Sequence, residues 1–268
     1  HDRAGSRSRL FANDKGMKKL IIANWKANPE SVGKARALAK ALERETAAQK
    51  SADIVVAPPS PFLAGVAPLL SRARLGAQDV FWEEGAYTGA VSARQLRSLG
   101  VSHVIIGHSE RRIYMGETDV MVRKKVHAVL GRGMRAILCV GERERQGDAV
   151  AVTVGEQTKT ALEGLKKTWL RNLIVAYEPV WAISTMSVGA GADTPDRAFR
   201  ARLSIEKILV SRFGRGGARD VRIIYGGSVA PGNIEALMRE GGMDGVLVGN
   251  ASLEPKKFGE LVRLAVSS

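Results

Sequence analysis

The 268-residue sequence contains little cysteine and little histidine. Its single cysteine, Cys139, excludes an intramolecular disulfide and any metal site built from several thiolates. The four histidines are scattered along the chain without the spacing of zinc ligands. The residues therefore predict no metal site, and one lone cysteine is typical of a reducing, cytoplasmic compartment.

Long apolar runs and blocks of like charge are also missing. No run approaches the ~18 apolar residues of a membrane-spanning helix, so we expect no membrane contact. The formal net charge is +14, from 41 Lys and Arg against 27 Asp and Glu, and such a field attracts phosphorylated metabolites or nucleic acid. The basic residues form no long block and no aromatic-studded groove, which disfavours a nucleic-acid partner.

The first sixteen residues differ in composition from the rest. Residues 1–16 are polar and basic, with no apolar core of a signal peptide, and Met17 resembles a natural start. We expect 1–16 to be an upstream or added segment without order. Because a single α/β barrel commonly has this length, we expect 17–268 to form one domain.

After residue 18, short apolar runs alternate with longer amphipathic segments. The runs are almost continuously apolar, which indicates parallel strands that are buried on both faces. Apolar residues at helical spacing, such as Ala35, Leu38, Ala39 and Leu42, indicate helices that cover a sheet. We predict strands at 20–23, 54–57, 74–77, 103–106, 136–140, 173–176, 221–224 and 245–248. We predict helices at 32–49, 62–70, 93–99, 119–131, 150–169, 195–213, 231–239 and 255–266, with Pro231 and Pro255 in first turns.

Eight such units predict an α/β fold, a single-domain (βα)8 barrel of eight parallel strands. An open, doubly wound sheet is the competing fold. In a barrel, reactive groups belong at the carboxyl ends of the strands. Three predicted strands end at groups of this kind: Asn24 and Lys26 after the first, His108 after the fourth and Glu178 after the sixth.

The last two predicted strands end in glycine-containing turns. Tyr225-Gly226-Gly227-Ser228 follows the seventh strand and Gly249-Asn250 follows the eighth. Glycines let backbone N–H groups approach an anion closely, and this corner of a barrel often holds a phosphate. Each feature also has a structural explanation: a surface carboxylate, a helix cap, a solvated lysine or a tight turn.

Taken together, the motifs are similar to those of triosephosphate isomerase. The similarity rests on four stretches in the family's order: Asn24-Trp25-Lys26, Gly107-His108-Ser109-Glu110-Arg111-Arg112, Tyr177-Glu178-Pro179-Val180-Trp181-Ala182-Ile183 and Tyr225-Gly226-Gly227-Ser228-Val229. It extends essentially from Lys18 to the end of the chain. The resemblance implies an isomerase that interconverts dihydroxyacetone phosphate and D-glyceraldehyde 3-phosphate, in glycolysis and gluconeogenesis, without a metal or an organic cofactor.

The resemblance also assigns roles, which are the family's and are not worked out from spacing. It makes Glu178 the catalytic base, His108 the electrophile and Lys26 the cation beside the developing oxyanion. Asn24 would orient the substrate. The backbone around Ser228, Gly249 and Asn250 would hold the phosphate. We read Glu110 and Glu117 as ion-pair partners without a chemical role.

Two stretches depart from the family's pattern. The loop from Ser184 to Asp193, where a lid is expected to close, is several residues longer and lacks the usual tip glycines. Asn250 stands where a second glycine is usual. These changes leave open a second function, a barrel that binds phosphorylated sugars with impaired turnover. A third alternative is an anion- or nucleic-acid-binding protein that uses the positive field.

Members of the family are usually homodimers. The loop from Trp82 to Gly89 (the 82–89 loop) resembles the loop that reaches into the partner's active site, with Thr88 innermost. The resemblance thus implies a homodimer with this loop at the interface. The alternative is an ordinary loop between a strand and a helix.

Overall fold

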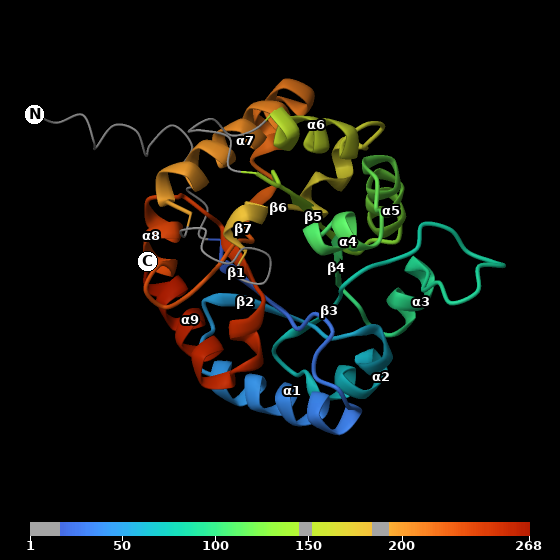
Figure 1. Cartoon of the computed structure of the whole chain (residues 1–268), viewed down its shortest axis with the longest axis vertical. Helices are drawn as coiled ribbons and strands as arrows, with labels where there is room; N and C mark the ends of the chain where they lie inside the picture. Colours follow the sequence, from blue (N-terminus) through green and yellow to red (C-terminus); the bar gives the residue numbers. More distant parts are fainter. Residues whose placement is uncertain (1–16, 145–151, 184–192) are drawn as a thin grey trace, which may run out of the picture.

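Eight parallel strands close into a barrel in the computed structural model, which describes residues 17–144, 152–183 and 193–268 (Figure 1). The strands pair in sequence order and the eighth pairs with the first, so the predicted barrel is confirmed and the doubly wound sheet is wrong. The strands are β1 Lys19–Asn24, β2 Ala52–Ala57, β3 Arg74–Ala77, β4 His103–Ile106, β5 Arg135–Val140, β6 Leu173–Tyr177, β7 Arg222–Tyr225 and β8 Gly245–Val248.

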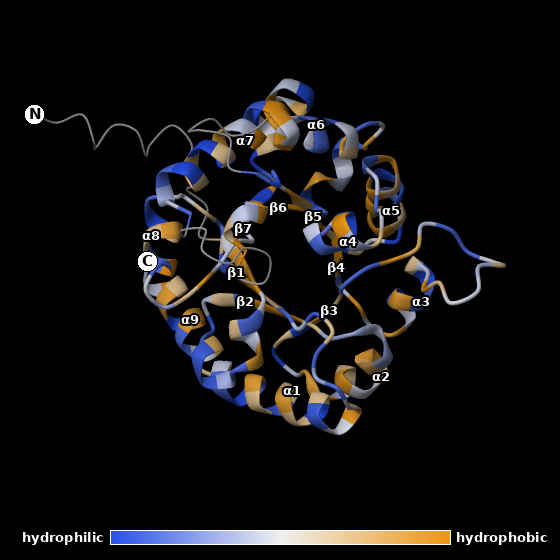
Figure 2. Cartoon of the chain, viewed as in Figure 1, coloured by the Kyte–Doolittle hydropathy of each residue, from blue (hydrophilic) through white to orange (hydrophobic). Residues whose placement is uncertain are grey.

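Helices surround the strands in a ring (Figure 1). The α-helices are α1 Val32–Thr46, α2 Leu63–Val66, α3 Ala93–Ser98, α4 Ser109–Tyr114, α5 Asp119–Gly131, α6 Val152–Ala161, α7 Pro195–Ala218, α8 Ile234–Arg239 and α9 Pro255–Ser267. Short 3-10 helices are η1 Ser60–Phe62, η2 Ala67–Leu69, η3 Lys167–Asn172, η4 Val180–Ala182 and η5 Asn250–Leu253. Hydrophilic residues lie along the outer sides of α7 and α9 (Figure 2).

The core has two layers because side chains alternate along each strand. One set packs against the helices and includes Ile21, Val56 and Val104. The other set fills the barrel and comprises Leu20, Ile22, Val55, Ala57, Ile105, Ile137, Cys139, Ile174, Ala176, Ile224 and Leu247. The inside of the barrel is therefore packed, and polar chemistry is confined to its two ends.

Several predicted helices differ from the structure, and α4 is not among the predicted helices. The segment predicted at 150–169 ends at Ala161, because Gly164 adopts a φ of 69°, and the chain continues as η3. The segment at 62–70 is broken into short helical turns. Pro231 lies in a turn before α8, whereas Pro255 does occupy a first turn.

Strand pairing places Glu178 at the mouth of the barrel. β5 and β6 pair up to Val140 and Tyr177, and the Glu178 N–H then donates to the Val140 carbonyl at 2.8 Å. Gly141 is needed beside it, since a Cβ there would lie 1.7 Å from the Glu178 carbonyl oxygen. In the described ranges no helix is long and apolar enough to cross a membrane. The cytoplasmic location stays a prediction, and the predicted segment 1–16 lies outside the described residues.

Candidate active site

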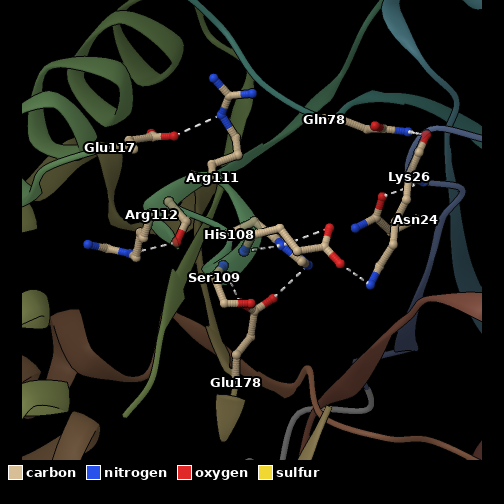
Figure 3. Close-up of polar contacts among 11 residues, drawn as sticks. Asn24, Lys26, Gln78, His108, Ser109, Arg111, Arg112, Glu117 and Glu178 are labelled. Atoms are coloured by element: carbon tan, nitrogen blue, oxygen red, sulfur yellow. Dashed lines mark hydrogen bonds and ion pairs between the residues drawn. The ribbon is translucent and has the colours of Figure 1, made fainter. Parts of the chain in front are cut away.

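The strand ends bring Asn24, Lys26, His108 and Glu178 together at one mouth of the barrel (Figure 3). Asn24 ends β1, His108 follows β4 and Glu178 follows β6, so residues up to 154 positions apart in sequence share one site. Asn24, His108 and Glu178 are all buried. The site is therefore largely withdrawn from bulk water.

A strained turn holds Lys26 in place. Its backbone has a φ of 54°, the only positive value of a non-glycine residue in the described chain. Two side chains support this conformation: the Asn24 Oδ1 accepts from the Lys26 N–H at 3.1 Å, and Gln78 Nε2 donates to the Lys26 carbonyl at 2.8 Å. The Lys26 ammonium contacts Glu110 Oε1 at 2.5 Å. Backbone strain of this kind is typical of residues whose position matters for function.

His108 caps α4 with its ring. Its Nδ1 accepts the Glu110 N–H at 3.3 Å, which requires an unprotonated Nδ1 and places the ring proton on Nε2. The Nε2 atom lies 3.3 Å from Glu178 Oε1. The His108 ring, held by this cap, thus presents its Nε2–H group to the site as a hydrogen-bond donor.

The Glu178 carboxylate is only 1% exposed. Its Oε2 accepts the Ser109 N–H at 3.1 Å, while Oε1 has no hydrogen bond to any described residue. Burial, and then the Glu178 carboxylate, raise the pKa of the neighbouring Cys139 thiol well above its usual value. The Cys139 thiol therefore stays protonated; it lines the cavity beside Glu178 and does not act as a nucleophile.

A cleft of about 200 Å³ opens beside these groups. Its walls include Asn24, Lys26 and His108 and the following residues from the glycine turns and α9: Gly226, Gly227, Ser228, Val229, Gly249, Asn250 and Lys257. All predicted site residues except Glu178 line this cleft. Glu178 lines the adjoining cavity of about 420 Å³, on its Ser109 side.

Comparison with known proteins agrees with this geometry. Residues 19–265 match the family model described as triosephosphate isomerase. The chain belongs to the triosephosphate isomerase family. It is 45% identical to the triosephosphate isomerase of Citrifermentans bemidjiense over 92% of this chain and 99% of that protein. It is 42% identical to that of Herpetosiphon aurantiacus over 91% and 98%.

Family membership confirms the recognition made from the four motifs and the predicted enzyme class, an isomerase of triose phosphates. The roles of individual residues are not tested by the match. Most of the predicted lid, Ser184 to Ala192, lies outside the described residues. In the described ranges no group of three or more His, Cys, Asp or Glu is arranged to hold a metal ion.

A buried carboxylate that the sequence did not single out holds the chain after β6. Glu142 Oε1 accepts from the Tyr177 hydroxyl and from Trp181 Nε1, both at 2.9 Å. Burial and this carboxylate raise the pKa of Tyr177 far above its usual value. Trp181 also lies under the Arg197 guanidinium, 5.0 Å from ring centroid to Cζ. Glu142 therefore fixes the point from which the lid segment departs.

Three further contacts were missed from the sequence. The backbone N–H of Ser109 binds Glu178, the Gln78 side chain supports the turn at Lys26, and Lys257 lines the cleft. None has a sequence signal of its own, since each depends on where distant strand ends meet. The ion pairs predicted for the two glutamates are present: Glu110 with Lys26, and Glu117 with Arg111 at 2.8 Å.

Proposed function

We propose that this chain carries out the family's isomerisation by a carboxylate proton shuttle, with Glu178 as the base. One observation supports this most strongly: the buried Glu178 carboxylate lies 3.3 Å from an imidazole whose Nε2 carries the proton. Lys26 lies on the far side of His108 from Glu178 (Figure 3). The neutral donor thus lies between the base and the cation at this mouth of the barrel.

The chemistry follows from these positions. Glu178 takes a proton from the carbon next to the substrate carbonyl, and an enediolate forms as negative charge moves to oxygen. The Nε2–H of His108 and the Lys26 ammonium donate to the enediolate oxygens; loss of one such donor typically costs ~2.7–4 kcal/mol of transition-state stabilisation. Glu178 then returns the proton to the neighbouring carbon, while the His108 ring passes the hydroxyl proton from one enediolate oxygen to the other, so that the carbonyl and hydroxyl groups exchange places. No electron acceptor is needed, because the ketone and the aldehyde are isomers.

Glu178 has to change its hydrogen bonding to act. In the structure its Oε2 is held by the Ser109 N–H, on the side away from the cleft. We infer that substrate binding turns the carboxylate from Ser109 toward the cleft. The carboxylate then faces the substrate carbon, and Oε2 no longer accepts the Ser109 N–H.

The substrate phosphate belongs at the glycine turns. Ser228 and Gly249 line the cleft, and the turn at Gly249 leads into η5; turns of this kind offer backbone N–H groups to an anion. Asn250 lines the same wall. We propose that these three residues bind the phosphate and that Asn24 orients the substrate beside Lys26.

Substitution of Glu178 by Gln tests the base. Turnover of glyceraldehyde 3-phosphate in a coupled assay should fall at least ~10²-fold, the usual range for a general base. Circular dichroism and binding of a phosphate analogue should be unchanged. Near-full activity in the variant would reject Glu178. If the unsubstituted, folded chain binds the analogue but has no turnover, the barrel is a phosphorylated-sugar-binding protein.

We also propose that the chain forms a homodimer through the 82–89 loop. Residues 83–89 are exposed and the loop projects from the barrel between β3 and α3 (Figure 1). A cavity of about 570 Å³ lies beside the active site and is lined by Lys26, Gln78 and Glu110. A loop from a second copy could close this cavity and support the turn at Lys26.

Thr88→Arg tests the dimer. Sedimentation should show a dimer for the unsubstituted chain and a monomer for Thr88→Arg, because a buried charge at the tip opposes association. Activity should fall with it. Ser98→Arg, at the exposed end of α3, is the matched control and should remain dimeric. A monomeric unsubstituted chain with full activity would contradict the proposal.

A further inference from the structure

The other mouth of the barrel, at the amino ends of the strands, also has polar side chains that point inward. Residues two positions before the apolar interior have the same orientation as that interior, because strand side chains alternate. Val55, Ile105, Ile137 and Ile224 fill the barrel. The residues two positions earlier are Asp53, His103, Arg135 and Arg222, and Arg74 has the same alignment on β3, where Leu75 and Ala77 face outward.

Positive charge exceeds negative charge at this mouth. The Arg222 Nη1 pairs with Asp53 Oδ2 at 3.0 Å, which neutralises that carboxylate. The side chains of Arg74 and Arg135 form no hydrogen bond or ion pair with any described residue. Burial, followed by the charges of Arg222 and Arg74, lowers the pKa of Arg135. A partly desolvated guanidinium without an anionic partner is unfavourable.

His103 lies deepest in this cluster and is 1% exposed. Strand register places it directly opposite Arg135. Its Nδ1 lies 2.8 Å from Ser102 Oγ, which donates to the Leu75 carbonyl at 3.0 Å. With the hydroxyl proton used in this way, Nδ1 must carry the ring proton.

The second ring nitrogen of His103 has no hydrogen-bond partner in the part of the chain that the structure describes. Its Nε2 is buried and forms no hydrogen bond with a described residue. Burial, then the charges of Arg135, Arg74 and Arg222, lower the pKa of His103 to about 3, so the ring is neutral near pH 7. Among the described residues, two guanidiniums without an ion pair and one imidazole nitrogen without a hydrogen bond therefore lie at the same mouth.

We propose that this mouth is a second anion site, which binds a phosphate-type oxyanion through Arg74, Arg135 and Nε2 of His103. A guanidinium offers a planar pair of donors that matches an oxyanion edge. The nearby Asp53 carboxylate is already paired with Arg222 and leaves the other two arginines available. The site lies at the opposite ends of the strands from Lys26 and Glu178, so it is separate from the substrate site.

Binding requires His103 to change tautomer, because a lone pair on Nε2 would repel an anion. Nδ1 first loses its proton to water and Nε2 gains one. The Ser102 hydroxyl then rotates away from the Leu75 carbonyl and donates to the unprotonated Nδ1. The change leaves no backbone group unsatisfied, since the Leu75 carbonyl also accepts the Ser102 N–H at 2.9 Å. The net protonation of the ring is unchanged.

Nitrogen NMR of the chain with ¹⁵N-labelled histidine tests the site. Addition of inorganic phosphate should move the His103 Nε2 resonance, saturably, from the range of an unprotonated to that of a protonated ring nitrogen. Sodium chloride at equal ionic strength should not. Arg135→Met should weaken the apparent phosphate affinity at least about tenfold, the loss expected for one charge-assisted contact. Arg36→Met, at an exposed position of α1, removes the same charge and should respond like the unsubstituted chain.

Lys26→Met separates the two anion sites, because it removes the active-site ammonium and should leave the His103 response intact. Arg74→Met changes an exposed side chain and serves if Arg135→Met does not fold. The proposal is overturned by an unmoved His103 resonance, or by an equal response to chloride, which would mean screening alone. It is also overturned if the response survives loss of the arginines or disappears in Lys26→Met.

Discussion

At the scale of single residues, the active site depends on close backbone approaches as much as on charged side chains. The Ser109 N–H holds Glu178 on one side. On the other side lies Gly226, where a Cβ would come within 2.7 Å of Glu178 Cγ. Any larger residue at 226 would therefore displace the carboxylate. Room for Glu178 to turn is built into the β7 glycine turn.

One prediction at this scale concerns the contribution of Lys257 to substrate binding. It lines the phosphate cleft from α9, and its side chain is 42% exposed, so solvent screens its charge. We expect Lys257→Met to raise KM for glyceraldehyde 3-phosphate about threefold, from loss of a contact worth ~0.5–1 kcal/mol, with kcat nearly unchanged. The neighbouring Lys256→Met is the matched control, because Lys256 does not line the cleft. Equal effects in the two variants would assign the change to general charge.

At the scale of elements, one carboxylate oxygen of Glu142 links the end of β6 to the turn that follows it. Glu142 Oε1 accepts both the Tyr177 hydroxyl and Trp181 Nε1, and the side chain is buried. Glu142→Ala leaves two buried donors unsatisfied, so we expect a loss of about 2–4 kcal/mol in the free energy of unfolding. Glu142→Gln keeps a carbonyl oxygen and should lose much less. Urea unfolding measures both, and equal losses would show that the carboxylate charge, not the shared acceptor, stabilises this turn.

The elements also show what the sequence could predict. All eight strands were found within two residues at each end, because strands buried on both faces are short apolar runs that stand out from their flanks. Lys26, His108 and Glu178 lie at one mouth as the sequence predicts, because parallel strands bring their carboxyl ends together there, and their catalytic roles stay predictions. Helix ends were found less well, since one glycine such as Gly164 can end a helix that apolar spacing would continue. The roles of Ser109 and Glu142 depend on tertiary contacts that no local pattern encodes.

At the scale of the whole molecule, the barrel separates two polar mouths by a packed apolar interior. The carboxyl mouth combines a carboxylate, an imidazole and an ammonium, while the amino mouth has an excess of guanidiniums around His103. Part of the net charge of +14 is thus buried or half-buried at a defined place and not spread over helix surfaces. Folding has to desolvate this charge, so the amino mouth links the stability of the molecule to its solution conditions.

The lowered pKa of His103 makes the stability of the protein depend on pH. Its pKa falls from 6.5 in the unfolded chain to about 3 in the folded one, so between these values the unfolded state binds more protons. The contribution of the neutral His103 ring to the free energy of unfolding is therefore fully present above pH 6.5. It is lost as the pH falls, by up to about 1.4 kcal/mol per pH unit. Urea unfolding of His103→Phe in phosphate-free buffer should show a shallower loss between pH 6.5 and 4.5 than the unsubstituted chain. His127→Phe, at a partly exposed histidine, should keep the full slope, and an equal slope in His103→Phe would mean that other groups carry the acid sensitivity.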